Sequence, residues 1–217
     1  MRDYKSFAAG EFYHVFNRGN GKMDIFRESS DYELFLSRLE EYLYPERRPT
    51  EGALLQGRER YQRAPFPSET FSLIAYCLMP NHHHLLIRQN TDTPIGSLML
   101  KLCGGYARCF NKKYDRVGSL YQDQFKAVRV DSNEYLLYLT AYIHLNPVTA
   151  ALVRDADQYP YSSYKEYLGE EGKKLCVKDD VTGQFGKISE YEAFVQEARD
   201  IIRTRDDLSH YLIDTDQ

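Results

Sequence analysis

The sequence predicts an α+β fold: a ferredoxin-like, RRM-like antiparallel sheet with helices on one face, plus a further helix laid against it and a mainly helical C-terminal extension. Short runs of apolar, β-favouring residues alternate with longer stretches whose apolar residues recur every three or four positions. Their order is strand, helix, strand, strand, helix, strand, helix, which is typical of the split β-α-β arrangement. At 217 residues the chain has the length of one domain with an appendage.

One polar, proline-containing stretch at residues 45–70 interrupts this pattern, and its length is typical of a functional or disordered loop. In order, we expect a strand at 11–17, a helix from 30 or 31 to about 44, strands at 71–79 and 82–88, a helix from 94 to about 114, a strand within 120–130, a helix at 135–146 and a helix from 189 to about 203. A tight Pro80-Asn81 corner joins the second and third strands.

Three of the expected helices have recognisable N-termini. Ser30 or Asp31 can cap the first helix, because either side chain can accept a backbone N–H. Thr93 followed by Pro94 is an N-cap with proline at the first helical position. Residues 131–134 form a capping-type start for the third helix.

The charge is unevenly distributed. Residues 1–154 hold 20 Lys and Arg against 17 Asp and Glu, a balance of +3, whereas residues 155–217 hold 8 against 15, a balance of −7. The acidity of the chain, whose net charge is −4, therefore lies in the C-terminal part. Residues 101–129 are locally basic and contain only two acids. The bases are Lys101, Arg108, Lys112, Lys113, Arg116, Lys126 and Arg129. Such a run is either a solvated helix face or a phosphate-binding surface.

The four cysteines contain no Cys-x-x-Cys pair, which indicates reduced thiols in a cytoplasmic protein rather than a disulfide framework. The N-terminus has no signal pattern, and no apolar run approaches the length of a membrane span. We therefore expect a cytoplasmic protein with no membrane partner.

Three of the six histidines lie in a row at the start of the third expected strand. Because successive side chains of a strand point to opposite faces, His82 and His84 share one face, about 6–7 Å apart along the strand. His83 points to the other face. Two imidazoles side by side on a rigid strand can bind one metal ion, although a fortuitous cluster at a strand end has the same spacing.

Tyr142 and Asn146 are four residues apart, so they occupy one face of the helix, one turn from each other. An Asn amide oxygen can complete a metal site made by two histidines, and a Tyr hydroxyl nearby could attack a bound phosphate. The alternative is that Tyr142 only packs and that Asn146 caps a new helix at Pro147. Residues 148–153 either extend the helix with a bend or begin that new helix.

Four stretches, in order, carry a resemblance to a known family. They are Tyr13-His14-Val15-Phe16-Asn17-Arg18-Gly19, Met79-Pro80-Asn81-His82-His83-His84-Leu85-Leu86, Gly118-Ser119-Leu120-Tyr121-Gln122-Asp123-Gln124-Phe125-Lys126 and Tyr142-Ile143-His144-Leu145-Asn146-Pro147-Val148. Together they resemble the HUH single-strand DNA transposases with one catalytic tyrosine, and among them the REP-associated tyrosine transposases. The resemblance implies a catalytic domain at residues 1–154 and leaves an acidic C-terminal extension at 155–217.

Carried over residue by residue, the resemblance implies that His82, His84 and Asn146 bind the metal and that Tyr142 is the nucleophile. Imidazole ligands alone would favour zinc-like metals, whereas the resemblance implies Mg²⁺ or Mn²⁺. His83 departs from the family pattern, because a bulky apolar residue is usual there; we expect a neutral, hydrogen-bonded imidazole that faces the helices. The third ligand is Asn rather than Gln, as in the REP-associated branch.

The implied activity is metal-dependent cleavage and transfer of single-stranded DNA near hairpins, through a 5′-phosphotyrosine intermediate. The implied partner is single-stranded DNA with a hairpin, and a homodimer with shared sites is an open alternative to a complete single-chain site. His14 is expected to be a core residue or a neighbour of the site rather than a ligand. The residues expected to track the DNA backbone are Arg18, Lys101, Arg108, Lys112, Lys113, Arg116 and Lys126.

Two other functions fit parts of the sequence. A domesticated, non-catalytic protein that binds hairpin DNA would keep the fold without the activity. A single-stranded RNA-binding module has the same strand order and stacks bases on aromatic residues of its sheet. The set of two histidines, a tyrosine and an asparagine favours the enzyme over both.

Overall fold

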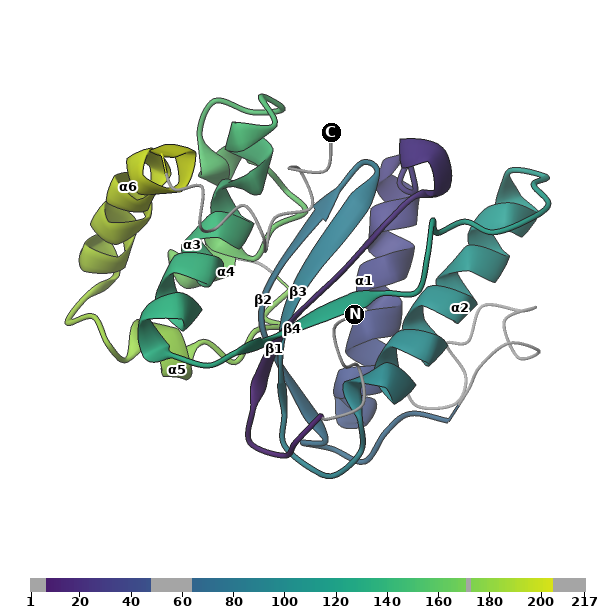
Figure 1. Cartoon of the computed structure of the whole chain (residues 1–217), viewed down its shortest axis with the longest axis horizontal. Coiled ribbons are helices and arrows are strands. Elements are labelled where there is room, and N and C mark those ends of the chain that lie inside the picture. The colour runs from purple at the N-terminus through teal and green to yellow at the C-terminus, as the bar shows by residue number, and fades with distance from the viewer. Residues whose placement is uncertain (1–6, 48–63, 171–172, 205–217) are drawn as a thin grey trace.

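A four-stranded antiparallel sheet lies at the centre of the computed structural model, which describes residues 7–47, 64–170 and 173–204 (Figure 1). The strands are β1 (Phe12–Arg18), β2 (Phe71–Met79), β3 (His82–Gln89) and β4 (Lys126–Val130). Their order across the sheet is β2-β3-β1-β4, and every neighbouring pair is antiparallel. The predicted ferredoxin-like, α+β fold class is therefore confirmed.

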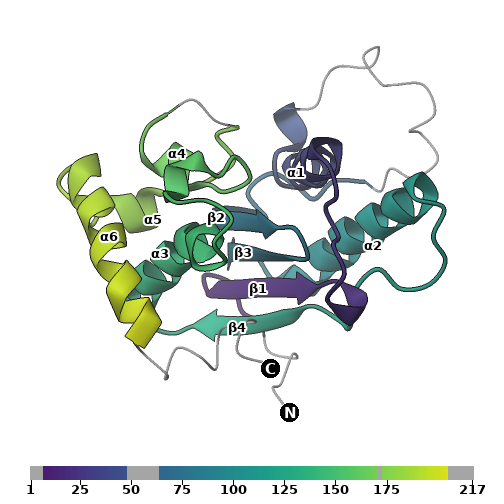
Figure 2. The same cartoon turned by 90° about the horizontal axis from the view of Figure 1, so that it is seen from above.

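Helices cover both faces of this sheet (Figure 2). They are α1 (Ser29–Leu43), α2 (Ile95–Lys113), α3 (Asn133–Thr149), α4 (Tyr164–Tyr167), α5 (Asp179–Thr182) and α6 (Ile188–Thr204). The α1 and α2 helices lie side by side on one face, and α3 lies on the other with α6 packed against it (Figures 1 and 2). The long C-terminal helix occupies the stretch predicted for it.

Alternation along β3 divides the buried apolar residues into two sets. Leu85 and Ile87 pack into the core beneath α1 and α2, whereas Leu86 packs into the core beneath α3. His83 lies on the same face of the strand as Leu85 and Ile87, and His84 lies on the same face as Leu86. The single strand therefore serves two cores, and its histidines are distributed between them as the alternation predicts.

The first helix starts earlier than predicted. Its N-cap is Glu28, whose carboxylate accepts a backbone N–H in the first turn, while the Asp31 side chain accepts the N–H of Glu28. This is a capping box, with Asp31 at the third helical position. The prediction that Ser30 or Asp31 caps the helix was wrong, because the reciprocal pair uses a Glu at the cap, a residue outside the usual set.

The second and third helices differ in how their N-termini are satisfied. In α2, Pro94 is itself the N-cap, without a side-chain bond, and the Ile95 N–H donates to Gln89 Oε1 at 3.1 Å. The predicted Thr93 cap was wrong because a side chain at the end of β3 supplies the acceptor. In α3, Ser132 is the N-cap and accepts the N–H of Tyr135, so the capped start lies within the predicted residues 131–134.

The third helix continues through Pro147 and ends at Thr149. The Ala150 N–H donates to the Asn146 carbonyl at 3.0 Å and closes the last turn. Proline removes one N–H from the helix but keeps a helical φ, so near the end the loss is confined to one bond. Asn146 is therefore a residue inside α3 rather than the cap of a new helix.

The segment after α3 covers the outer edge of β2. Leu78 N–H donates to the Tyr161 carbonyl at 2.9 Å, and Ser163 N–H donates to the Tyr76 carbonyl at 3.0 Å. These bonds extend the sheet by a short bridge between Cys77 and Ser162. The backbone of β2 is thus protected on this side, where an open strand could pair with another chain.

A buried histidine joins this segment to α3. His144 is fully buried, and its two ring nitrogens lie 2.8 Å from Tyr191 Oη and 2.8 Å from Ser163 Oγ. Tyr191 belongs to α6, so one imidazole connects three parts of the C-terminal half. Burial lowers the pKa of His144 to about 3, which keeps the ring neutral at pH 7.

Most of the predicted 45–70 loop lies outside the described residues, since it includes 48–63. Among the residues that the structure does describe, no helix is both long enough and apolar enough to cross a bilayer.

Candidate active site

His82 and His84 face α3, and their rings lie 5.0 Å apart, nearly perpendicular to each other. The β3 strand lies between β1 and β2, so backbone hydrogen bonds hold it on both sides. In this register His84 lies between Phe16 of β1 and Cys77 of β2. A central strand is a rigid support, which suits side chains whose relative positions matter.

The α3 helix brings Tyr142 and Asn146 to the same place. The amide nitrogen of Asn146 lies 3.3 Å from His84 Nε2, and the ring of Tyr142 lies 5.5 Å from that of His84 in an edge-on arrangement. The amide oxygen of Asn146 is buried and has no hydrogen-bond partner among the described residues. The structure therefore brings His84 together with residues 58 and 62 positions away, which the sequence could only suggest as a set.

The donor set can be tested for its fit to a divalent cation. Two ligand atoms at about 2.1 Å from one octahedral ion lie about 3 Å apart, and His84 Nε2 and the Asn146 amide are separated by 3.3 Å. Because the oxygen and nitrogen of an amide are assigned from their contacts, a rotated amide would direct the unpartnered oxygen to the same point. In the described part of the chain no three His, Cys, Asp or Glu side chains form a metal-binding group. The Asn146 amide oxygen is thus an unpartnered oxygen that could serve with the two imidazoles as a third ligand.

Two side chains outside that set contact the histidines. His14 of β1 places its Nε2 2.9 Å from His84 Nδ1, and Asn81 places its Oδ1 2.6 Å from His82 Nδ1. We expected His14 to be a core residue or a neighbour of the site, and it is buried beside His84. From the sequence we predicted only a turn at Asn81. Its position next to His82 could have suggested that its side chain contacts that histidine.

The imidazoles of His14 and His84 are neutral at pH 7. Burial lowers the pKa of His14 to about 3. Burial, followed by the nearby His82 and His14, holds the pKa of His84 well below its usual value. Neutral imidazole is the form that binds metals.

His83 points away from the site, as predicted, and lies against Phe35 of α1 and Tyr121. The expectation that it is hydrogen-bonded was wrong, since neither ring nitrogen has a hydrogen-bond partner among the described residues. Burial, followed by the adjacent His82, lowers the pKa of His83 to about 3. A neutral ring in an apolar surrounding costs less than a charged one, which explains how the core accepts it.

The chain between β1 and α1 supports the corner before His82. The N–H groups of Ile25 and Phe26 both donate to the Pro80 carbonyl, at 2.8 and 2.9 Å, and Gly19 N–H donates to the Asn81 carbonyl at 2.8 Å. A Cβ at Gly19 would lie 2.1 Å from the Met23 carbonyl oxygen, so only glycine fits there. This packing fixes the backbone that presents the histidine pair.

All four proposed functional side chains are buried. His84 and Asn146 are 0% and 1% exposed, and His82 and Tyr142 are each 4% exposed. These four side chains therefore have little contact with solvent. Burial also strengthens every electrostatic interaction within the site.

The basic residues occupy different environments. Lys126 opens β4 and pairs with Phe16, which in turn pairs with His84, so Lys126 lies in the same row of the sheet as the site. Arg18 ends β1 opposite His82. Arg108 and Lys112 are exposed on α2.

Two further basic residues interact mainly with their own surroundings. Lys101 donates to the Ala64 carbonyl at 2.7 Å and lies 3.7 Å from the Phe66 ring centre, about 16 Å along α2 from Lys112. Arg116 donates to the Asn111 side chain at 2.9 Å. A role of either residue in DNA binding stays a prediction.

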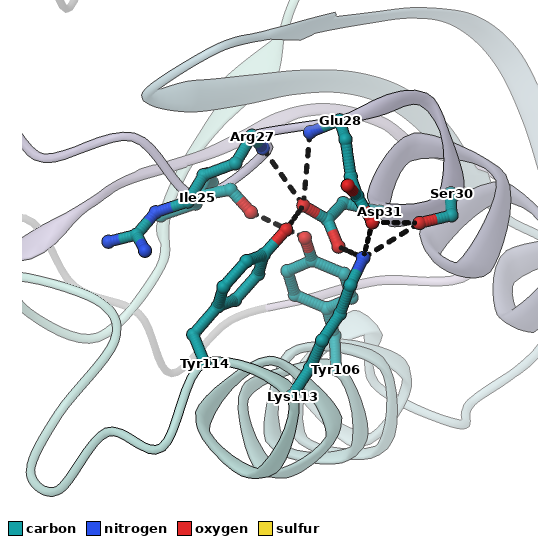
Figure 3. Close-up of polar contacts among 8 residues, drawn as sticks. All are labelled: Ile25, Arg27, Glu28, Ser30, Asp31, Tyr106, Lys113 and Tyr114. Atoms are coloured by element: carbon teal, nitrogen blue, oxygen red, sulfur yellow. Dashed lines mark hydrogen bonds and ion pairs between the residues drawn. The ribbon is translucent and has the colours of Figure 1, made fainter.

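Lys113 forms an ion-pair cluster that joins α2 to the start of α1 (Figure 3). Its Nζ lies 2.5 Å from Glu28 and 2.6 Å from Asp31, a carboxylate that also accepts hydrogen bonds from Tyr114 and from the backbone. Although desolvation opposes the shift, hydrogen bonds to Asp31 and Glu28 raise the pKa of Lys113. The charge of Lys113 is thus already balanced within the protein.

Tyr106, the other tyrosine near the basic run, lies on α2 beneath the opposite face of the sheet. It is completely buried, and its hydroxyl donates to the Ile25 carbonyl (Figure 3). Burial raises the pKa of Tyr106 far above its usual value, so the hydroxyl stays protonated. This tyrosine therefore packs in the core, away from the histidine pair.

Comparison with known proteins supports the resemblance. Residues 58–146 match the family model described as "Transposase IS200 like", a stretch that contains His82, His84, Tyr142 and Asn146. No curated protein matches the sequence.

Two solved structures are similar to this one. The structure of a REP-associated tyrosine transposase bound to a REP hairpin aligns with a TM-score of 0.55 and 15% identity, over 81% of this chain and 88% of that one. A crystal structure of a candidate transposase from Deinococcus radiodurans R1 aligns with a TM-score of 0.39 and 13% identity, over 63% of this chain and 91% of that one. At such low identity the first likeness shows the fold.

Proposed function

Because residues 58–146 match the IS200-like transposases and the fold is that of a REP-associated tyrosine transposase, we propose that this chain cuts and rejoins single-stranded DNA next to hairpins. The reaction is a phosphoryl transfer to a tyrosine, and it depends on a divalent cation. The observation that carries the proposal is the meeting of the Tyr142 ring, the His84 imidazole and the Asn146 amide on one face of the sheet.

In the proposed reaction the Tyr142 oxygen attacks a backbone phosphorus atom. A bond forms between that oxygen and phosphorus, the bond from phosphorus to the 3′ oxygen breaks, and the departing oxygen takes up a proton. The DNA stays attached through its 5′ phosphate, and the free 3′ hydroxyl can reverse the step. Since one phosphodiester replaces another, the exchange needs no external energy source.

His82, His84 and Asn146 would hold the cation, Mg²⁺ or Mn²⁺. When bound, such an ion neutralises charge on the scissile phosphate. The two imidazoles and one amide would supply three ligands, and they would leave the ion open to the oxygens of a bound phosphate. The strand and helix that carry these ligands orient them before the DNA arrives.

The proposed substrate is DNA with a hairpin, as bound by the structural neighbour. Lys126 and Arg18 lie beside the site in the sheet and favour contact with the phosphate backbone there, whereas Arg108 and Lys112 are exposed on α2, which covers the other face, and would contact DNA farther from the site. A homodimer and a division of the chain at residue 154 also stay predictions.

Labelled single-stranded DNA containing a hairpin tests the proposal. Incubation with Mn²⁺ or Mg²⁺ should give a nick and a protein–DNA adduct that survives denaturation, and a chelator should abolish both. Mass spectrometry of the digested adduct should place the phosphate on Tyr142. Equal cleavage by the His82→Ala, His84→Ala double variant, or a phosphate on another tyrosine, would contradict this assignment.

One observation favours a second function, that of a hairpin-binding protein without cleavage. Tyr142 and His82 are each only 4% exposed, as expected of a protein whose site is never used. The same assay separates the two, because tight binding of hairpin DNA without any adduct would support the non-catalytic protein. The RNA-binding alternative is disfavoured, because α3 covers the sheet face on which such modules stack bases.

A further inference from the structure

Both histidines proposed to bind the metal have their Nδ1 atom occupied by a side chain outside the ligand set. Asn81 Oδ1 lies 2.6 Å from His82 Nδ1, and His14 Nε2 lies 2.9 Å from His84 Nδ1. The same ring atom is held in both cases, from two different directions and by two different residue types. In a neutral imidazole only one nitrogen carries a proton, so the partner of Nδ1 decides what Nε2 can do.

The contact with Asn81 has only one consistent proton arrangement. The amide nitrogen of Asn81 donates to the Lys22 carbonyl at 3.3 Å, so the amide oxygen is the atom that faces His82. An amide oxygen only accepts hydrogen bonds. The His82 Nδ1 must therefore carry the proton, and Nε2 carries the lone pair.

The corner that contains Asn81 is held in place from the backbone. Pro80 accepts two N–H groups from the chain before α1, and the Asn81 carbonyl accepts the Gly19 N–H. That chain is in turn fixed by the Asp31 carboxylate, which accepts the Arg27 and Glu28 N–H groups (Figure 3). The acceptor for His82 is thus positioned before any metal binds.

The contact with His14 completes the pattern on His84. If His84 binds a metal through Nε2, its Nδ1–H must donate to His14 Nε2, and the proton of His14 then lies on its own Nδ1. That atom is buried and has no hydrogen-bond partner among the described residues. A buried, unsatisfied donor destabilises the fold, so this arrangement is retained at a cost.

We propose that Asn81 and His14 are positioning residues that keep the proton of His82 and His84 on Nδ1 and thereby present both Nε2 atoms as metal ligands. This inference rests on the proposed function, because it assumes that the pair binds a cation. Partners of this kind fix the orientation of a ligand ring, and their loss typically lowers metal affinity about 10- to 100-fold.

The first test needs neither metal nor DNA. Long-range ¹H–¹⁵N spectra of the ¹⁵N-labelled full chain distinguish the two neutral forms of each histidine. His82 in the wild-type protein should carry its proton on Nδ1, and in Asn81→Leu that preference should be lost. A proton on Nε2 of His82 in the wild-type protein would overturn the inference while leaving the proposed function intact.

The second test measures the Kd for Mn²⁺ by isothermal titration. Asn81→Leu and His14→Leu should each raise the Kd about 10- to 100-fold, whereas Asn81→Asp, which keeps an acceptor, should bind nearly as well as the wild type. His83→Leu is the matched control, since it changes an adjacent histidine on the other face and should leave the Kd unchanged. The dispersion of the amide spectrum shows whether each variant is folded.

The outcomes distinguish the positioning role of Asn81 and His14 from the metal site itself. An unchanged Kd in a folded Asn81→Leu variant overturns the positioning role. If His82→Ala, His84→Ala binds Mn²⁺ as tightly as the wild type, the metal site itself is wrong, and both the inference and the proposed function fail. If Asn81→Leu does not fold, Asn81→Asp decides, because a loss of affinity there means that the acceptor is not what matters.

Discussion

On the α3 face of the sheet His14, His84 and Asn146 form a row of polar contacts, with neighbours 2.9 and 3.3 Å apart. On the α1 and α2 face the ring of His83 lies against Phe35, and neither of its nitrogens has a hydrogen-bond partner among the described residues. These side chains are almost completely buried, and His83 and His84 are adjacent in the same strand. Burial alone therefore does not distinguish them.

The difference lies in what each face does with a buried polar group. A buried imidazole without hydrogen bonds lowers the stability of the fold, because it loses its bonds to water and forms none in the protein. An apolar side chain could therefore replace it. The connected groups cannot be exchanged in this way, because each one orients the next. We therefore expect substitutions on the α3 face to change chemistry, and substitutions on the opposite face to change stability.

The largest effect should come from removing the hydroxyl of Tyr142, and removal of the Tyr106 hydroxyl on the other face is the matched control. Tyr142→Phe should reduce DNA cleavage on the order of 10⁴-fold or more, since the nucleophile is lost, with unchanged hairpin binding and an unchanged melting temperature. Tyr106→Phe should leave cleavage intact and lower the free energy of unfolding by about 1 kcal/mol, because only a hydrogen bond to Ile25 is lost. Cleavage by Tyr142→Phe at the wild-type rate would contradict the assignment of the chemistry to the α3 face.

Acid should destabilise the protein through its buried histidines. Burial lowers the pKa of His14, His83 and His144 to about 3 each, from an ordinary value of 6.5. Between these values the unfolded chain binds protons that the folded chain does not, so stability is complete above pH 6.5 and is lost as the pH falls towards 3. Each ring contributes up to about 1.4 kcal/mol per pH unit. Urea unfolding at pH 7.5, 6.5 and 5.5 measures the loss, and a flat profile would contradict neutral burial.

His83→Leu should stabilise the protein by about 1–2 kcal/mol, since an apolar side chain of similar size replaces an unsatisfied polar ring. The same variant should make the acid loss less steep by the contribution of one histidine. Denaturant unfolding at pH 7.5 and 5.5 measures both effects. If the variant is instead less stable at pH 7.5, the His83 ring makes a stabilising hydrogen bond, and the contrast between the two faces is wrong.

The smallest effect distinguishes two adjacent lysines. Lys112→Ala should weaken hairpin binding and reduce the dependence of log K on log salt by about 0.7–0.9, the value for one phosphate contact. Lys113→Ala should leave that slope nearly unchanged and instead lower stability, because Asp31 loses an ion pair. Fluorescence anisotropy at several salt concentrations, together with thermal unfolding, separates them. A reduced slope in Lys113→Ala would assign its charge to DNA.

Local patterns in the sequence were sufficient to predict the strands of the sheet and a capped start of α3 within residues 131–134. The start and end of β2 and the alternation through 82–84 follow from residues that touch their own neighbours along the chain. The same reasoning failed at the N-termini of the first two helices. Glu28 forms a local capping box with Asp31 but is not one of the usual N-cap residues, and Gln89 reaches the Ile95 N–H from the end of a strand.

The candidate site shows the same division. The spacing of His82 with His84, and of Tyr142 with Asn146, could be read as faces of a strand and of a helix. The contact between His14 and His84 joins residues 70 positions apart, and that between Lys113 and Asp31 joins residues 82 apart. Such pairs depend on the packing of whole elements, so no local pattern in a single sequence predicts them.

A ribosome finishes α3 well before it makes the partners of His144. Ser163 and Tyr191 follow that histidine by 19 and 47 residues, so at about 5–20 residues per second the second partner is made roughly 2–9 s later. During that interval the outer side of α3 has no α6 to cover it. The helix that carries Tyr142 therefore reaches its final packing late in synthesis, once α6 has emerged.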